Sequence, residues 1–123
     1  MKEGSTPKIL LLCHPNNPTG RIYSNKILKM CIEWAKSKEM HIICDEIYGN
    51  SIFPGEKFSS IAKVMRDQKK CDDYLGEYVH IAAGFSKDFA LSGSRVGILL
   101  THNKELLEAV DSLGYFKAVS NHT

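Results

Sequence analysis

Residues 78–97 read YVHIAAGFSKDFALSGSRVG, and this stretch determines how the rest of the chain is interpreted. Residues 78–83 form an apolar run typical of a buried strand, and residues 96–100 form another. The segment between them is too short for a helical crossover, so we expect the two strands to be antiparallel. Lys87 then lies just past the carboxyl end of a strand, where open α/β sheets bind their ligands.

Two more buried strands are expected upstream, at residues 9–13 and 40–44. Between them, Ser24 is suited to cap an amphipathic helix that continues to about Ala35. A strand, a helix and a strand in this order form a parallel unit with a right-handed crossover. The sequence therefore predicts an α/β fold with a mostly parallel sheet, in which three parallel strands are joined by one antiparallel strand.

The remaining segments are predicted in less detail. A short helical pattern begins at Ile61, after a less regular region. Asn103 is suited to cap a last helix, which we expect to stop or kink at Gly114. His41 is interpreted only as the start of a strand.

Composition favours a folded domain and excludes some classes of partner. The 123 residues are 43% hydrophobic and 24% charged, and a net charge of +2 gives no basic surface of the kind that nucleic-acid binders carry. The amino terminus lacks an apolar signal core, and no stretch approaches the roughly 18 apolar residues of a membrane span. We expect a cytoplasmic protein without nucleic-acid or membrane partners. The four cysteines have no C-x-x-C spacing, so we expect reduced thiols and no metal site.

Polar side chains follow the three parallel strands at one edge of the predicted sheet. Asn17 follows the first strand, Asp45 and Tyr48 follow the second, and Lys87 follows the third. Because the carboxyl ends of parallel strands meet at one edge, these side chains can point into one crevice. A lysine amine can form an imine with an aldehyde, and Arg95 can hold a phosphate through paired hydrogen bonds. This set suits pyridoxal 5'-phosphate.

Each residue also has a simpler interpretation. Lys87 alone is a solvated loop lysine, Arg95 caps a strand, and Asp45 with Glu46 begins a solvated loop. The combination of several motifs in register therefore carries the argument.

Four motifs line up in this sequence: N-P-T-G at 17–20, D-x-x-Y at 45–48, S-K at 86–87 and R-V-G at 95–97. In this order and spacing they resemble the large domain of the fold-type I, class I/II aminotransferases, which use pyridoxal phosphate. D-E-I-Y and S-K-D-x-x-L-x-G-x-R-V-G are closer still to the 1-aminocyclopropane-1-carboxylate synthase and synthase-like branch. The resemblance runs from about residue 9 to the end and implies a three-layer sandwich.

The resemblance implies a role for each site residue. Lys87 would hold the cofactor as an internal aldimine and then move the α-proton of the substrate. Asp45 would partner the pyridine nitrogen, because a nearby carboxylate favours the protonated ring that acts as an electron sink. Tyr48 and Asn17 would hydrogen-bond the phenolic oxygen of the cofactor.

For the phosphate, the resemblance implies Arg95 as the main ligand and Ser86 as a further contact. Gly84 departs from the family pattern, because many relatives carry a serine three residues before the lysine. The missing hydroxyl would remove a hydrogen bond to a charged oxygen, worth about 1.5 to 3 kcal/mol. We therefore expect a serine at position 84 to tighten cofactor binding.

Family members are considerably longer than this chain, are homodimers and act on amino acids. Residues 1–123 would then be a partial cofactor-binding large domain, without the small domain and the N-terminal part. Its full-length form would act by transamination or elimination. One alternative is a non-catalytic truncated product that associates with the full-length enzyme or other proteins through open sheet edges. Another is a small flavodoxin-like binder of phosphate ligands, whose lysine never forms an imine.

Overall fold

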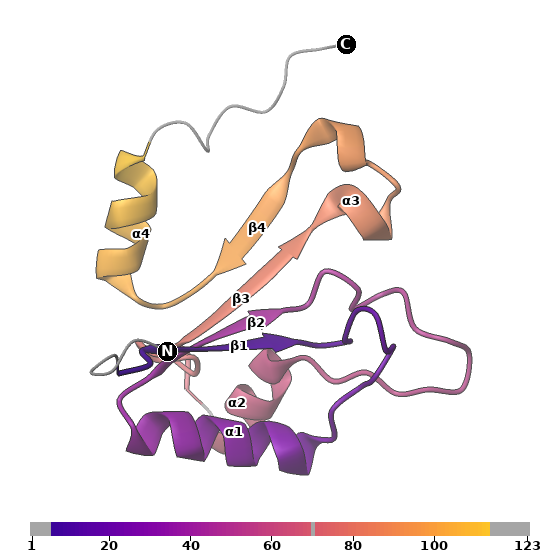
Figure 1. The fold of residues 1–123 in the computed structure, drawn as a ribbon. Coiled ribbons are helices and arrows are strands. Elements are labelled where there is room, and N and C mark those ends of the chain that lie inside the picture. Colours follow the sequence, from indigo (N-terminus) through magenta and orange to yellow (C-terminus); the bar gives the residue numbers. More distant parts are fainter. Residues whose placement is uncertain (1–5, 70, 114–123) are drawn as a thin grey trace.

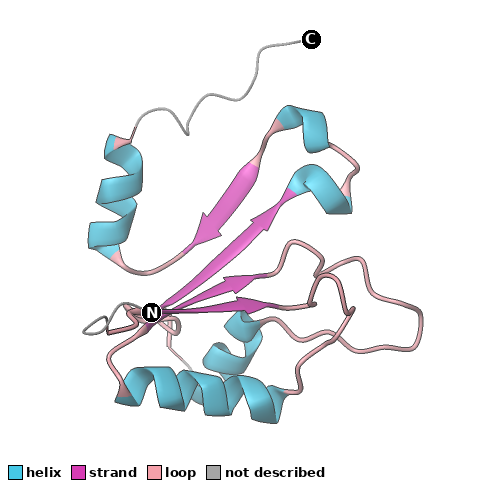
Figure 2. Ribbon diagram, viewed as in Figure 1, coloured by secondary structure: helices cyan, strands magenta, loops and turns pink. Residues whose placement is uncertain are grey.

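The computed structural model describes residues 6–69 and 71–113 (Figures 1 and 2). Its elements are, in order, β1 (Ile9–Cys13), α1 (Asn25–Ser37), β2 (His41–Asp45), α2 (Ile61–Lys69), β3 (Val79–Gly84), α3 (Phe85–Asp88), a 3₁₀ turn (Ser92–Ser94), β4 (Gly97–Leu100) and α4 (Lys104–Ser112). The four strands and the three longer helices confirm the sequence prediction. The short helix α3 and the 3₁₀ turn were not expected.

The four strands form one sheet in the order β1-β2-β3-β4. β1 pairs with β2 and β2 pairs with β3 in parallel, and β4 runs antiparallel to β3 with Gly97 opposite Gly84. This confirms the predicted α/β class with three parallel strands and one antiparallel strand. The parallel arrangement brings the carboxyl ends of β1, β2 and β3 to the same edge of the sheet.

Helices α1 and α2 cover one face of the sheet (Figure 1). Leu12, Cys44 and Ile81 lie in register on that face and are buried with the apolar sides of both helices. Because side chains alternate along a strand, Ile9 and Leu11 point to the opposite face, where they are 55% and 62% exposed. Of the three layers that we expected, the described residues build two, the sheet and the α1–α2 layer, while α4 lies beyond β4.

Side chains fix the start of each of three helices. Ser24 accepts from the N–H of Ile27 at the start of α1, and Asn103 accepts from the N–H of Leu106 at 2.8 Å in α4. Both predicted caps are therefore confirmed, and the expected stop at Gly114 lies outside the described residues. Glu46 is buried, and its Oε1 accepts from the N–H of Ile61 at 2.8 Å, at the start of α2. Glu46 thus holds a helix and does not begin a solvated loop.

The described strands leave both edges of the sheet open, at β1 and at β4. Every residue of β4 is exposed, including Ile98, Leu99 and Leu100. None of the helices in the described ranges has the length and apolarity needed to cross a membrane. All four cysteines are free, and burial is the main factor that raises the pKa of the Cys44 thiol, which therefore stays protonated.

Two histidines form a hydrogen-bonded network across the sheet. His41 Nδ1 and His80 Nε2 are 2.9 Å apart, and His80 Nδ1 lies 2.7 Å from the hydroxyl of Thr101. Thr101 also accepts from the N–H of Asn103, the residue that caps α4. His41 is therefore more than the start of a strand, because it connects β2 through β3 to the turn before α4.

This network predicts that stability decreases in mild acid. Burial, followed by the charge of His41, lowers the pKa of His80 below its usual value. The unfolded chain binds the proton more readily, so the stabilisation is complete above about pH 6.5 and is lost as the pH falls through the folded-state pKa. Urea unfolding across this range should show the loss, and His80→Gln should reduce it. An equal pH dependence in both proteins would contradict this assignment.

Candidate functional site at the carboxyl edge of the sheet

The loop after β1 is closed by its own hydrogen bonds. The Thr19 hydroxyl donates to Asn16 Oδ1 at 2.6 Å, and the N–H of Gly20 donates to the carbonyl of Asn16 at 2.7 Å. His14 anchors the base of this loop, because its Nδ1 accepts from the N–H of Tyr23 and its Nε2 lies 3.1 Å from the carbonyl of Ser59. The two partners fix the Nε2–H tautomer of a fully buried ring. Asn17 is therefore presented from a rigid support.

The chain after β2 turns tightly at the same edge. Asp45 is the last residue of β2, and its Oδ1 accepts from the N–H of Ile47 at 3.1 Å. The N–H of Ser51 donates to the carbonyl of Tyr48 at 2.9 Å, which closes the next turn. These bonds hold the Asp45 carboxylate and the Tyr48 ring beside the end of the strand.

Lys87 lies in the single helical turn α3, which directly follows β3. The helix is anchored to the residue before β4, because the N–H of Phe85 donates to the carbonyl of Val96 at 3.3 Å. Lys87 is exposed, and its Nζ lies 5.5 Å from the centre of the Tyr48 ring. This distance is within the range of a cation–π contact. The amine therefore lies near the face of the tyrosine ring, a contact between two strand ends that the sequence did not specify.

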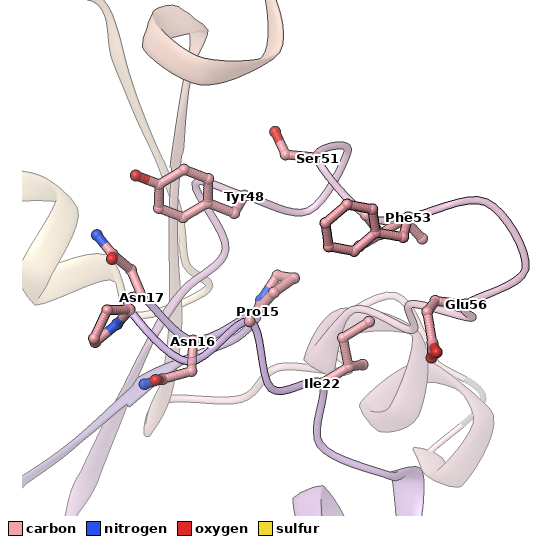
Figure 3. A pocket seen from close by; sticks show the side chains of 11 residues that line it. Pro15, Asn16, Asn17, Ile22, Tyr48, Ser51, Phe53 and Glu56 are labelled. Carbon is pink, nitrogen blue, oxygen red and sulfur yellow. The ribbon is translucent and has the colours of Figure 1, made fainter.

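Asn17 and Tyr48 line one pocket of about 450 Å³ (Figure 3). Figure 3 shows the two side chains together on one side of the pocket, while Phe53 and Glu56 lie on the other side. Phe53 is 82% exposed, so this side of the pocket is open to solvent. The pocket offers an amide and a phenol beside apolar surface, which suits one polar edge of an aromatic ligand.

Ser86 and Arg95 line a second hollow, a groove of about 660 Å³ formed mainly by the ends of β3 and β4 and by α4. Arg95 has a positive φ of 53°, which is uncommon outside glycine, and its Nη1 lies 3.4 Å from the carbonyl of Ser92. The remaining guanidinium donors are available to an anion. The groove therefore carries the donors expected for a phosphate.

Gly84 lines this groove at the point where β3 and β4 pair. A Cβ atom at this position would lie 2.9 Å from the carbonyl oxygen of Val96 and 3.1 Å from Cδ1 of Ile47. Both approaches are too close, and the first involves backbone. The expectation that a serine here would tighten cofactor binding is therefore corrected, since the strands leave no room for the side chain.

We predict that Gly84→Ser destabilises the chain by about 1 to 3 kcal/mol, because β4 must shift to admit the new Cβ. Gly93→Ser is the matched control, since a Cβ at Gly93 would meet nothing within 4 Å. Urea unfolding of the two variants gives the comparison. Equal urea midpoints for the two variants would contradict the prediction, because they would show that β4 can shift away from β3 without loss of stability.

The structure brings the predicted residues together in two groups. Asn17 and Tyr48 share the pocket, and Ser86 and Arg95 share the groove. Lys87 lines neither hollow but reaches over Tyr48, and no hydrogen bond or ion pair joins Asp45 to the other predicted residues in the described part of the chain. The same part of the chain holds no cluster of three or more potential metal ligands.

The donor set fits pyridoxal phosphate. Lys87 offers an amine for the aldehyde, and Asp45 a carboxylate for the ring nitrogen. The phenol and amide in the pocket can donate to the ring oxygen, and the donors in the groove can bind a phosphate.

Sequence reasoning missed three residues that support this edge. Glu46 and His14 are buried polar residues that hold a helix and a loop. Asn50 Nδ2 donates to Asp88 Oδ2 at 2.8 Å, which joins the Tyr48 turn to the Lys87 helix. For His14 and Glu46, the available signal in the sequence was a polar residue at the end of an apolar strand. The Asn50–Asp88 pair, 38 residues apart, left no signal in the sequence.

The mixed sheet, with three parallel strands and one antiparallel strand, has the arrangement of the fold-type I aminotransferases. The family model described as aminotransferase class I and II matches residues 1–123, and the chain belongs to this family.

Curated relatives place it within that family. The chain is 35% identical over 122 residues to 1-aminocyclopropane-1-carboxylate synthase 6 of Oryza sativa subsp. japonica, covering 99% of this chain and 22% of the relative. It is 41% identical over 122 residues to the human protein named "Probable inactive 1-aminocyclopropane-1-carboxylate synthase-like protein 2", covering 98% and 20%. The chain thus spans about a fifth of the length of these two relatives.

Solved structures share the fold. The PLP-bound C-S lyase from Staphylococcus hominis matches with a TM-score of 0.73 at 24% identity, over 85% of this chain and 25% of that chain. At this identity the likeness concerns the fold, which is that of the fold-type I aminotransferases.

Proposed function

We propose that this chain is the cofactor-holding part of a pyridoxal-phosphate enzyme that acts on amino acids, by transamination or elimination, and that Lys87 carries the reaction. The observation behind the proposal is the position of the Lys87 amine, 5.5 Å from the ring of Tyr48 at the edge where Asp45 and Asn17 also emerge. The other parts of the site would come from a longer protein, since the chain spans only a part of its relatives.

Each residue has a defined task in this proposal. When bound, the cofactor supplies an aldehyde for attachment and a ring that withdraws electrons. The Lys87 amine would hold the aldehyde carbon with loss of one water, and, once displaced by the substrate amine, would accept and return the proton at the substrate α-carbon. The Asp45 carboxylate would accept from the ring N–H, and its negative charge would favour the protonated ring.

The pocket and groove residues orient the ligand. Tyr48 and Asn17 would donate to the ring oxygen from the pocket, and Arg95 with Ser86 would bind the phosphate from the groove. We propose that the longer protein is a cytoplasmic homodimer, as in the family that the motifs resemble.

A second candidate is a non-catalytic chain that associates with a full-length enzyme or another protein. It is favoured by the uncovered sheet face, where Ile9 and Leu11 are exposed, and by the open edges at β1 and β4. A mass measurement in solution, with and without a full-length relative, separates the two candidates. A complex with the relative would support the second one.

We predict that the 123-residue chain alone is catalytically inactive and binds pyridoxal phosphate weakly or not at all. Its donors lie in two separate, open hollows, so the site is poorly preorganised for one ligand. The exposed apolar strands should also make the chain self-associate. The test is to titrate the chain with cofactor, follow the visible absorption of the bound form and measure the solution mass. A monomer with micromolar affinity that turns over an amino acid would contradict the prediction.

The proposed function itself is tested in a chimera that carries residues 9–113 in place of the matching segment of a plant relative. Borohydride reduction with pyridoxal phosphate, followed by peptide mapping, should label Lys87 before any other lysine. Labelling spread over surface lysines would support the flavodoxin-like alternative, in which Lys87 has no covalent role.

A further inference from the structure

The Lys87 helix and the Tyr48 turn approach each other across the carboxyl edge. Each is rigid within itself, because Ser51 N–H donates to the carbonyl of Tyr48 and Phe89 N–H donates to the carbonyl of Phe85. Asn50 lies inside the first turn, and Asp88 directly follows Lys87 in the second. The relative position of Tyr48 and Lys87 therefore depends on how the two turns are joined.

One hydrogen bond joins them. Asn50 Nδ2 donates to Asp88 Oδ2 at 2.8 Å, and it is the one side-chain hydrogen bond between the loop after β2 and α3 in the described part of the chain. Gly49 fixes the approach of the loop, since a Cβ there would lie 3.1 Å from the carbonyl oxygen of Glu46 and 3.2 Å from Phe58. The loop is therefore closely packed at Gly49, the residue directly before Asn50.

The second carboxylate oxygen of Asp88 makes the position of Lys87 depend more strongly on the hydrogen bond to Asn50. Asp88 Oδ1 is buried and has no hydrogen-bond partner. If the Asn50 amide is replaced, neither oxygen of the Asp88 carboxylate keeps a side-chain hydrogen bond. Turning toward water then lowers the free energy of the carboxylate, because water can hydrogen-bond to both oxygens. Because Asp88 directly follows Lys87 in α3, we expect that a backbone shift that brings Asp88 toward water would also move Lys87 relative to the Tyr48 ring.

We infer that Asn50 and Asp88 are positioning residues that hold the Lys87 amine against Tyr48. The inference rests on the proposed function for its catalytic meaning, because it concerns the same lysine. It adds two residues outside the four motifs and requires a hydrogen bond between them, whichever side supplies the donor.

A measurement without cofactor tests the contact directly. Reductive methylation with ¹³C-formaldehyde gives Lys87 an NMR signal, assigned by its loss in Lys87→Arg, and the Tyr48 ring shifts this signal. The Tyr48→Leu variant gives the chemical shift of the Lys87 signal when the ring is absent. We expect Asn50→Ala and Asp88→Ala each to move the Lys87 signal to that position, with the folded signals of the core unchanged.

Matched variants separate positioning from general damage. Asp88→Asn should keep the signal in place, because the new amide oxygen still accepts from Asn50. Asn50→Asp should displace it, because two carboxylates would face each other. Combining Asn50→Asp with Asp88→Asn should restore it, because donor and acceptor are exchanged. An unmoved signal in Asn50→Ala and Asp88→Ala, or no restoration in the exchanged pair, would overturn the inference.

The chimera connects the contact to the cofactor. Asn50→Ala should lower the rate of borohydride trapping at Lys87 by about three- to ten-fold, and the exchanged pair should recover it. Unchanged trapping in a chimera that does label Lys87 would overturn the inference. If the parent chimera labels no lysine preferentially, the proposed function fails, and the NMR series still decides whether the two residues position Lys87.

Discussion

Lys87→Ala in the chimera should abolish covalent attachment of pyridoxal phosphate and lower turnover of the best amino acid about 100- to 10,000-fold, the usual contribution of a general acid–base group. The reason is geometric, because Lys87 is the residue whose amine stands over Tyr48 at the carboxyl edge. The alanine should not disturb the fold, since the side chain is exposed and sits in a single helical turn. Borohydride trapping and a turnover assay with a panel of amino acids measure the effect.

The control for this prediction is a second exposed lysine. Lys63 lies on α2, where it forms a 2.8 Å ion pair with Asp67 and lines neither the pocket nor the groove. Lys63→Ala should leave trapping and turnover unchanged, because an exposed pair of this kind contributes little. Trapping that survives in Lys87→Ala would show that another lysine holds the cofactor.

Asp45→Asn in the chimera should keep the cofactor bound and slow the removal of the α-proton by about 100- to 1,000-fold, the effect of removing one preorganised electrostatic partner. An amide cannot supply the negative charge that favours a protonated ring nitrogen. The amide oxygen can still accept from the N–H of Ile47, so the turn after β2 should remain intact. Loss of deuterium from α-deuterated substrate measures the step.

Asp45→Ala separates the two effects of this carboxylate. It removes both the charge and the acceptor for Ile47 N–H, so it should lower stability as well as the rate. Asp45→Asn with an unchanged rate of proton removal would count against the electrostatic role of Asp45.

The sheet could be predicted from the sequence because each strand is a continuous apolar run. The register was not predicted, and the structure shows that it places Leu12, Cys44 and Ile81 side by side in the core. The caps at Ser24 and Asn103 were also visible, since capping residues act on a local hydrogen bond. The strands and helix caps could therefore be predicted because they depend on residues that are close together in the sequence.

The parts that could not be predicted depend on contacts between distant residues. No local pattern shows that the Cβ of residue 84 would meet the carbonyl of Val96, because that contact depends on the pairing of β3 and β4. The same holds for the histidine network, which joins His41 to His80 and Thr101. The division of the site into a pocket and a groove likewise depends on how the loops turn in space.

The composition of the core has a consequence for the cooperativity of the domain. Its buried apolar residues come from β1, β2, β3, α1, α2 and the adjoining loops, and neither β4 nor α4 contributes one within the described ranges. The segment from β4 onward can therefore open without disrupting that core, and its amide hydrogens should exchange with solvent at a lower free energy. Arg95 lies directly before this weakly coupled segment, whereas Asp45 is the last residue of β2, a strand that contributes Ile42 and Cys44 to the core. A ligand that bridges them would join two units of unequal local stability into one cooperative unit.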